Sequence, residues 1–132
     1  MTTTWLKTSD GATLVIDEGE SCNVTAVPKD MAGAAITESN LATLTATLVD
    51  EATGDVINGR DAQSVLDANG GTVASDGTLT LRLQPADAAI VTAGDAGTIE
   101  AHILRLAWTW SDGVLTRTGV QEWGLKVRRK AG

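Results

Sequence analysis

The sequence predicts an all-β fold, an antiparallel β-sandwich of about seven short strands. Apolar and polar residues alternate along several short segments, which are rich in Thr and Val. Asp-Gly pairs that suit tight turns lie beside such segments, in "SDGA", "SDGT" and "SDGV". No segment carries the sustained apolar period of a helix.

Three segments show the alternation clearly. Residues 41–50, "LATLTATLVD", place Leu and Ala on one face and Thr on the other. Residues 78–83, "TLTLRL", and residues 121–128, "QEWGLKVR", put Leu79 and Trp123, respectively, on an apolar face. We expect each segment to be a half-buried strand.

The longest candidate strand spans residues 98–110, "TIEAHILRLAWTW". Its second half places four apolar residues on one face, namely Leu104, Leu106, Trp108 and Trp110. Its first half places apolar residues on the opposite face, namely Ile99, Ala101 and Ile103. A bulge or a change of partner sheet near Ile103 would reconcile the two halves, so we expect one there.

The connection "INGRDAQSVLDANGGTV", residues 57–73, has fragments of a phosphate-binding loop and a calcium loop, but neither motif is complete. We expect one or two helical turns capped by Asp61, with Arg60 paired to Asp61. Val65 and Leu66 would then close an open end of the sandwich. A second connection, residues 84–97, predicts a crossing between sheets that includes a helical turn begun by Pro85.

Large apolar side chains are few, because the chain has four Trp but no Tyr and no Phe. Trp110 lies next to the "SDGV" turn, so we expect it to be partly exposed and a candidate partner contact. Cys22 is the only cysteine, and its alternation with Val24 predicts a buried strand residue and not a reactive thiol. The predicted core contains Trp108, Trp123, Leu104, Leu106, Leu79 and Leu81.

The 132 residues carry a formal net charge of −7, yet four of the ten Lys and Arg residues lie in the segment 126–132. We therefore expect a single domain over residues 1–125 and a basic C-terminal tail over residues 126–132. The acidic body argues against nucleic acid as the main partner. The tail either contacts a partner or is a solvated chain end, and its basic residues are Lys126, Arg128, Arg129 and Lys130.

The sequence shows no set of residues typical of catalysis. One His, one Cys and scattered carboxylates give no recognisable spacing, so we predict no enzyme and no catalytic, cofactor-binding or metal-binding residue. No apolar run is long enough to span a membrane, and no secretory signal is visible. Synthesis and folding in a cytosol are therefore expected.

Two long stretches carry a resemblance to a known group of proteins. "LTATLVDEATGDVINGRDAQSVLDANGGTVASDGTLTLRLQPADAAIV", followed by "EAHILRLAWTWSDG", resembles small proteins of tailed bacteriophages and prophages that occur with head and head–tail genes. The match covers about residues 41 to 128 and includes an I-N-G connection, a P-A-D turn and an E-x-H strand. The resemblance implies an immunoglobulin-like sandwich, a structural role in the virion, assembly in the host cytoplasm, and no catalytic residue.

Two non-enzymatic functions follow as hypotheses. The first is a virion structural protein that binds capsid, connector or tail subunits, as a homo-oligomer or as part of a lattice. The alternative is a carbohydrate-binding module in which exposed Trp side chains stack on sugar rings. Burial of these Trp residues in the core would favour the first hypothesis.

Overall fold

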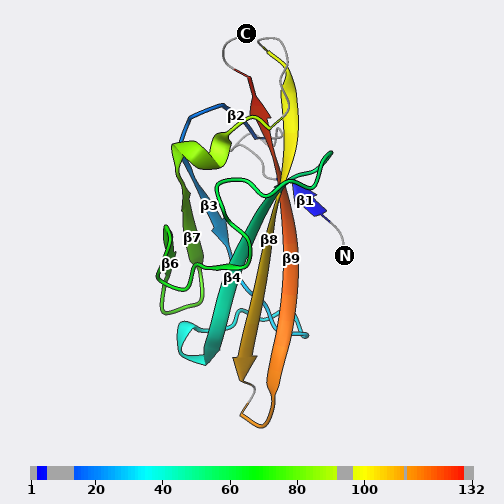
Figure 1. Cartoon of the computed structure of the whole chain (residues 1–132). Helices are drawn as coiled ribbons and strands as arrows, with labels where there is room; N and C mark the ends of the chain where they lie inside the picture. Colours follow the sequence, from blue (N-terminus) through cyan, green and yellow to red (C-terminus); the bar gives the residue numbers. More distant parts are fainter. Residues whose placement is uncertain (1–2, 6–13, 92–96, 112, 130–132) are drawn as a thin grey trace.

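The computed structural model describes residues 3–5, 14–91, 97–111 and 113–129, which form two β-sheets packed face to face (Figure 1). The larger sheet has the strand order β1-β9-β8-β4-β5, and β2 also pairs with β9. The smaller sheet has the order β3-β7-β6. The strands of the larger sheet are β1 (Thr3–Trp5), β2 (Val15–Asp17), β4 (Leu41–Asp50), β5 (Gln63–Ser64), β8 (Ile99–Ser111) and β9 (Thr116–Arg128). Those of the smaller sheet are β3 (Cys22–Ala26), β6 (Gly71–Val73) and β7 (Leu79–Leu83).

The all-β fold in two sheets is confirmed, but the larger sheet is not purely antiparallel as predicted. β1 and β2 both run parallel to β9, with Thr3 opposite Glu122 and Val15 opposite Lys126. The other strand pairs are antiparallel. The early strands β1 and β2 thus lie beside the last described strand, at one edge of the larger sheet.

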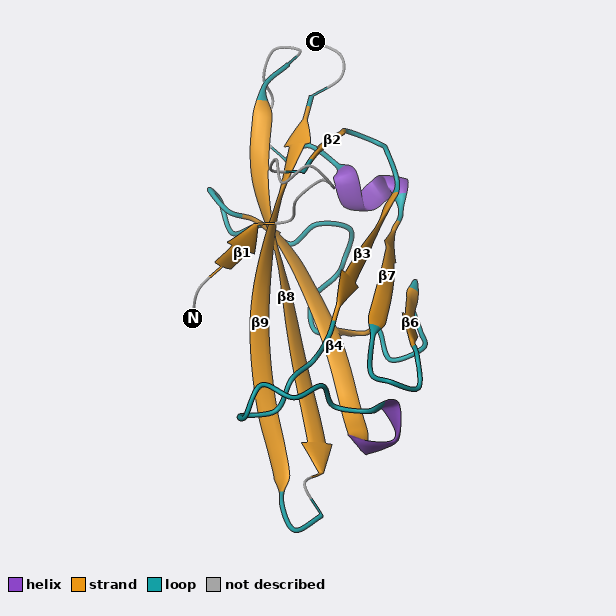
Figure 2. Ribbon diagram, turned by 180° about the vertical axis from the view of Figure 1, so that it is seen from behind, coloured by secondary structure: helices purple, strands orange, loops and turns teal. Residues whose placement is uncertain are grey.

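β8 and β9 form a long hairpin whose pairing runs without a register shift from Ile99–Arg128 to Ser111–Thr116. Neither the bulge nor the change of partner sheet expected near Ile103 is present, and the shift that does occur lies between Leu41 and Thr43, where β4 meets β8. The two apolar faces have another explanation, because His102, Ile103 and Leu104 are all buried and both faces of β8 are covered there. Figure 2 shows the lower end of the hairpin extending beyond the smaller sheet.

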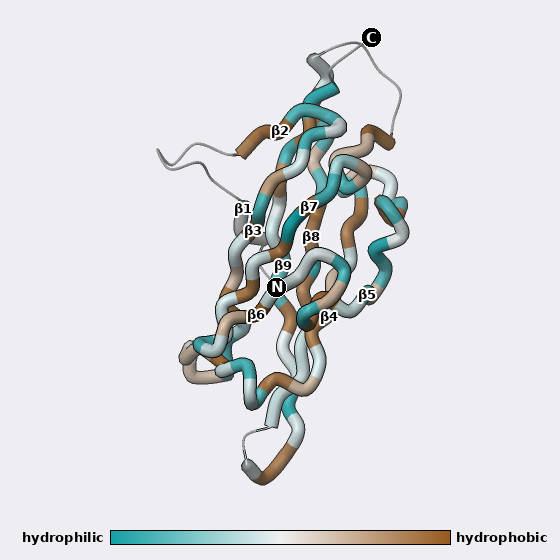
Figure 3. The backbone as a smooth tube through the Cα atoms, turned by 90° about the vertical axis from the view of Figure 1, so that its left-hand side faces the viewer, coloured by the Kyte–Doolittle hydropathy of each residue, from teal (hydrophilic) through white to brown (hydrophobic). Residues whose placement is uncertain are grey.

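The core lies between the two sheets and follows the predicted alternation. Figure 3 shows apolar and polar residues alternating along the strands. Full burial of one such Leu stabilises the fold by about 1.5–3 kcal/mol. Among the predicted core residues, Trp123 is only half-buried and packs against the core. The others lie fully inside it, namely Leu79, Leu81, Leu104, Leu106 and Trp108.

The connection of residues 57–73 has no helical turn, contrary to expectation. Asn58, Ala62, Asp67 and Asn69 all have φ between 51° and 55°, which a right-handed helical turn excludes. The segment instead forms turns around the short β5. Val65 is buried as predicted, and Leu66 packs partly buried against the core.

Two short 3-10 turns are present among the described residues, η1 (Glu38–Asn40) and η2 (Pro85–Ala88). η2 begins at Pro85, as predicted, because proline fixes a φ suited to the first position of a helical turn. Its Asp87 also accepts a hydrogen bond from the backbone N–H of Gln84, which caps the turn.

Candidate functional site

Arg60 and Asp87 form a buried ion pair that joins the 57–73 connection to η2. Arg60 Nε donates to Asp87 Oδ1 at 2.6 Å, and Arg60 Nη2 donates to Asp87 Oδ2 at 3.0 Å. The remaining nitrogen, Nη1, donates to Gln63 Oε1 and to the carbonyl oxygen of Asn69. The predicted local pair of Arg60 with Asp61 is therefore wrong, and Arg60 points into the protein.

The hydrogen bonds around Asp87 also set its ionisation. Burial opposes the charged form, but hydrogen bonds from Arg60, Asn58 and the backbone of Gln84 outweigh it and hold the pKa of the Asp87 carboxyl below its ordinary value. All of these hydrogen-bond donors are groups of the protein that hold the 57–73 connection against η2. The arrangement therefore fastens a loop and does not form a ligand site.

Cys22 is half-buried in β3, close to the same ion pair. Burial raises the pKa of the Cys22 thiol, and the negative charges of Asp87 and Glu20 raise it further. A thiol that resists ionisation is a poor nucleophile. The position therefore agrees with a structural strand residue.

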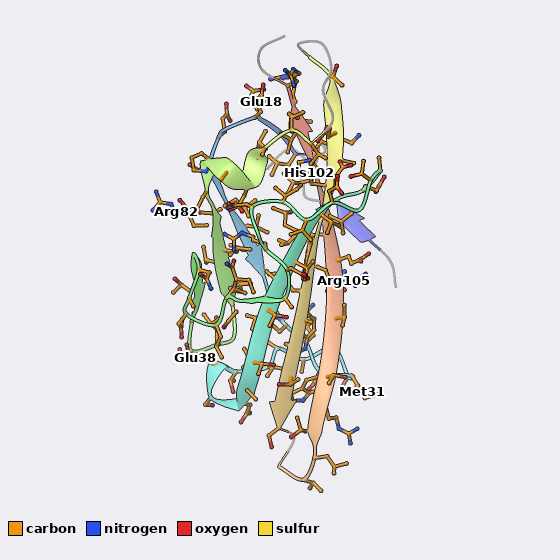
Figure 4. All side chains as sticks on the ribbon, viewed as in Figure 1. Glu18, Met31, Glu38, Arg82, His102 and Arg105 are labelled. Atoms are coloured by element: carbon orange, nitrogen blue, oxygen red, sulfur yellow. The ribbon has the colours of Figure 1, made fainter. Side chains whose placement is uncertain are left out.

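Three tryptophans line one groove of about 700 Å³ on the inner side of the β8–β9 hairpin. Trp108, Trp110 and Trp123 form its aromatic wall, and Lys29, Asp30 and Gln121 supply polar groups. The groove lies where the sandwich is open between β3, the connection that follows it, and the lower half of β9. Figure 4 labels Met31, another lining residue, beside this part of β9.

Trp110 is only 5 % exposed, so the prediction of a partly exposed residue is wrong. It lies in the same inward row as Trp108, and the chain from Asp30 to Ala32 lies beside it around a second hollow of about 450 Å³. Trp108 is held close to β9, because a Cβ at position 119 would lie 2.5 Å from Trp108 Nε1 and only glycine leaves that space. Trp108 and Trp110 therefore offer little exposed surface to a ligand, and the half-buried Trp123 offers more.

The groove offers binding chemistry and no catalytic pair. Its lining residues contribute hydroxyl, amide, ammonium and carboxylate groups, and among the described residues around it there is neither a His nor a Cys. Aromatic walls with a few polar groups suit a small ligand that is partly apolar, such as a sugar ring.

Most of the predicted basic tail belongs to the larger sheet. Lys126 and Arg128 lie in β9, and Arg128 forms an ion pair with Asp17 of β2 at 2.7 Å. Backbone hydrogen bonds continue to Arg129, whose N–H donates to the carbonyl oxygen of Thr98. The predicted boundary at residue 126 therefore cuts a paired strand. Lys130 lies outside the described residues.

An exposed apolar pair occupies the tip of the hairpin. Val114 and Leu115 are 87 % and 58 % exposed, and Figure 3 shows this lower end as apolar. Neither residue is among the contacts predicted from the sequence. The sequence does contain a pattern that could have indicated this exposed pair. Two apolar residues directly follow a Gly in a predicted turn, and turns usually contain polar residues.

Comparison with known proteins identifies no relative. No protein-family model matches the chain, and no curated protein matches its sequence. Within the part of the chain that the structure describes, no helix is long and apolar enough to cross a membrane.

Proposed function

We propose that this protein is a non-enzymatic structural subunit of a bacteriophage particle, in which it binds other virion proteins. The proposal places it as a capsid decoration protein or as an accessory subunit of the head–tail junction or tail. Its first support is the resemblance of residues 41 to 128 to small phage proteins. The fold and the surface of the hairpin add two further arguments.

The strand order supports the immunoglobulin-like part of the proposal. Immunoglobulin domains pair strands B, E and D in one sheet and C, F and G in the other. Assigning β3 as B, β7 as E and β6 as D reproduces the smaller sheet, and β4, β8 and β9 then correspond to C, F and G. β5 takes the place of the additional strand next to C that variable-type domains have.

The observation that carries the proposed function is the projecting hairpin tip. Val114 and Leu115 lie exposed at the end of two 13-residue strands, beyond the smaller sheet. Exposed apolar side chains on a projection suit insertion into a partner surface, where their burial would favour association. A subunit that binds a lattice in this way needs no catalytic residue.

The first experiment measures the copy number of the protein in purified phage particles, relative to the major capsid protein. A ratio near one is expected for a decoration protein bound across the lattice. A ratio far below one would support the head–tail junction or the tail. Absence from the particles would contradict the proposal.

Variants of the tip then test the mode of contact. Val114→Ser combined with Leu115→Ser should reduce incorporation at least about tenfold, because about 1.4 kcal/mol of lost apolar contact corresponds to that factor. Val56→Ser is the matched control, since Val56 is also an exposed valine but lies in a connection away from the hairpin. Equal incorporation of the tip variant and the control would remove the tip from the interface.

The tryptophan groove gives carbohydrate binding as a second candidate function, although Trp108 and Trp110 are buried and only Trp123 is half-buried. Three Trp residues and several polar groups line a single hollow, which is the composition of many sugar sites. Titration with oligosaccharides, followed by Trp fluorescence, tests this function directly. Saturable changes that are lost in Gln121→Ala would support it, whereas unchanged fluorescence across a glycan panel would contradict it.

A further inference from the structure

The inward row of the larger sheet ends in three buried groups that can bind a metal. Asp50 is the last residue of β4, and it lies opposite His102 of β8. Glu100 is two residues before His102 and shares its face. His102 is 0 % exposed and Asp50 is 2 % exposed. Figure 4 labels His102 in the upper half of the molecule, away from the hairpin tip.

The three side chains lie close together, at distances near those between the ligands of a single metal ion but not equal to them. His102 Nε2 lies 3.0 Å from Glu100 Oε1 and 3.9 Å from Asp50 Oδ1. Nitrogen and oxygen ligands lie about 2.0–2.2 Å from Zn²⁺, so two ligand atoms on one ion are about 3.4 Å apart in a tetrahedral arrangement and at most about 4.2 Å apart. The candidate ligand atoms of all three residues lie within 4.8 Å of one another. Small side-chain movements would bring them around one ion.

Neighbouring groups orient both carboxylates. The backbone N–H and the hydroxyl of Thr53 donate to Asp50 Oδ2 at 3.0 Å and 2.9 Å, which turns Oδ1 toward the imidazole. The backbone N–H of Val91 donates to Glu100 Oε1 at 2.9 Å. Such contacts fix metal ligands before the ion arrives.

The two ring nitrogens of His102 have different surroundings. A buried His ordinarily uses both ring nitrogens in hydrogen bonds. His102 Nδ1 is buried and has no hydrogen-bond partner, while Nε2 points at the two carboxylates. The ring is therefore held by its carboxylate side, which is the side that a cation would occupy.

We propose that Asp50, Glu100 and His102 bind one divalent transition metal ion, with Zn²⁺ as the best match. One imidazole and two carboxylates suit this ion, whereas Mg²⁺ and Ca²⁺ favour oxygen ligands alone. The three ligands leave a coordination position for water. The ion would join β4 to β8 and neutralise two buried carboxylates. The proposal goes beyond the proposed function and holds whether or not the protein belongs to a virion.

The affinity expected for this site is moderate. A His ligand usually donates its second ring N–H to an oxygen, and loss of such a contact weakens metal binding about 10–100-fold. Since Nδ1 has no such partner, we expect a dissociation constant for Zn²⁺ in the micromolar range, at least about tenfold weaker than in fully supported sites.

The experiment uses the full chain without an affinity tag, because His102 is its only histidine. ZnCl₂ is titrated into ¹⁵N-labelled protein while the two imidazole nitrogens are followed by NMR. We expect the Nε2 resonance to shift and to saturate at one equivalent, and a chelator to reverse the change. Zinc binding that leaves both His102 resonances unchanged would be an adventitious ion only, on surface carboxylates, and would overturn the proposal. Absence of any binding would also overturn it.

A variant pair gives a second test by calorimetry. Asp50→Asn should weaken Zn²⁺ binding by more than about 100-fold, since it replaces a ligand and not a supporting group. Glu51→Gln is the matched control, because Glu51 is the next residue and is exposed. Equal affinities of the two variants would overturn the proposal. If Asp50→Asn does not fold, the NMR titration of the unchanged protein still decides.

Discussion

Two buried ionic clusters in this protein differ in how completely they are paired. The Arg60–Asp87 cluster has one charge of each sign, and both carboxylate oxygens and all three guanidinium nitrogens form hydrogen bonds. The Asp50–Glu100–His102 cluster sets two carboxylates against one imidazole, with a 3.9 Å separation and a nitrogen without a partner. The first arrangement is complete without a ligand. The second brings two carboxylates to one imidazole and leaves His102 Nδ1 without a partner, so pairing and not burial separates the structural cluster from the candidate site.

The largest effect is expected from Asp87→Ala. It leaves the buried guanidinium of Arg60 without its carboxylate, and loss of one partner of a buried pair costs about 3–5 kcal/mol. Urea unfolding measures this cost. Asp61→Ala is the control, since Asp61 is exposed and close in the chain. A loss below about 1 kcal/mol for Asp87→Ala would mean that the pair does not fasten the connection.

The pH dependence of stability tests the same cluster with a smaller effect. The folded-state pKa of Asp87 lies below its unfolded value of about 3.9, so its contribution is fully present above about pH 5. It is lost as the pH falls from there through the folded pKa. The stability difference between the unchanged protein and Asp87→Asn should therefore be constant above about pH 5 and shrink toward pH 2. A difference that does not change with pH would show that the carboxyl has an ordinary pKa.

Asp50→Asn, measured with a chelator present, should cost less than about 1.5 kcal/mol. The amide oxygen still accepts hydrogen bonds from Thr53, and the change removes one of two neighbouring buried carboxylates. Excess Zn²⁺ should then stabilise the unchanged protein and not the variant, because only a ligand that binds the folded state raises stability. A loss of stability as large as that of Asp87→Ala would mean that the Asp50–Glu100–His102 cluster, like the Arg60–Asp87 pair, holds the fold together.

Arg105→Ala should cause the smallest loss of stability among these variants. Arg105 forms an ion pair with Glu122 at 2.8 Å, but its side chain is largely exposed. Exposed pairs of this kind contribute about 0.2–1 kcal/mol and weaken with salt. Thermal unfolding of the variant and the unchanged protein at low and high salt measures this contribution. A larger cost that is independent of salt would point to packing of the Arg105 side chain and not to its charge.

Strand parity accounts for much of what the sequence predicted about the fold. The alternation of apolar and polar residues predicted which faces of β4, β7 and β8 point into the core. The Asp-Gly pair predicted the turn between β8 and β9. The same alternation places His102 and Glu100 on the face of β8 that carries Leu104. It places Asp50 on the face of β4 that carries Leu48. The signal for the candidate metal site was therefore present, but the pairing of Asp50 with His102 depends on a register that no local pattern contains.

The errors arose where contacts are distant in the chain. Asp87 lies 27 positions after Arg60, so the local Asp61 was the only partner that spacing suggested. Trp110 was expected to be exposed because it lies near a turn, although the alternation along the strand puts it on the same face as Trp108. Residues of the connection after β3 lie beside it, and their position depends on how the two sheets pack.

The parallel pairing of β1 and β2 with β9 has a consequence for synthesis. Val15–Asp17 pairs with residues 126–128, so β2 cannot pair in the larger sheet before β9 has been synthesised. Contacts this far apart in the chain form slowly, because a long loop must close before they stabilise the fold. Until β9 is complete, β8 has only β4 beside it and its other edge is open to neighbouring chains. A chain in which β9 is not yet complete is therefore prone to association through the open edge of β8.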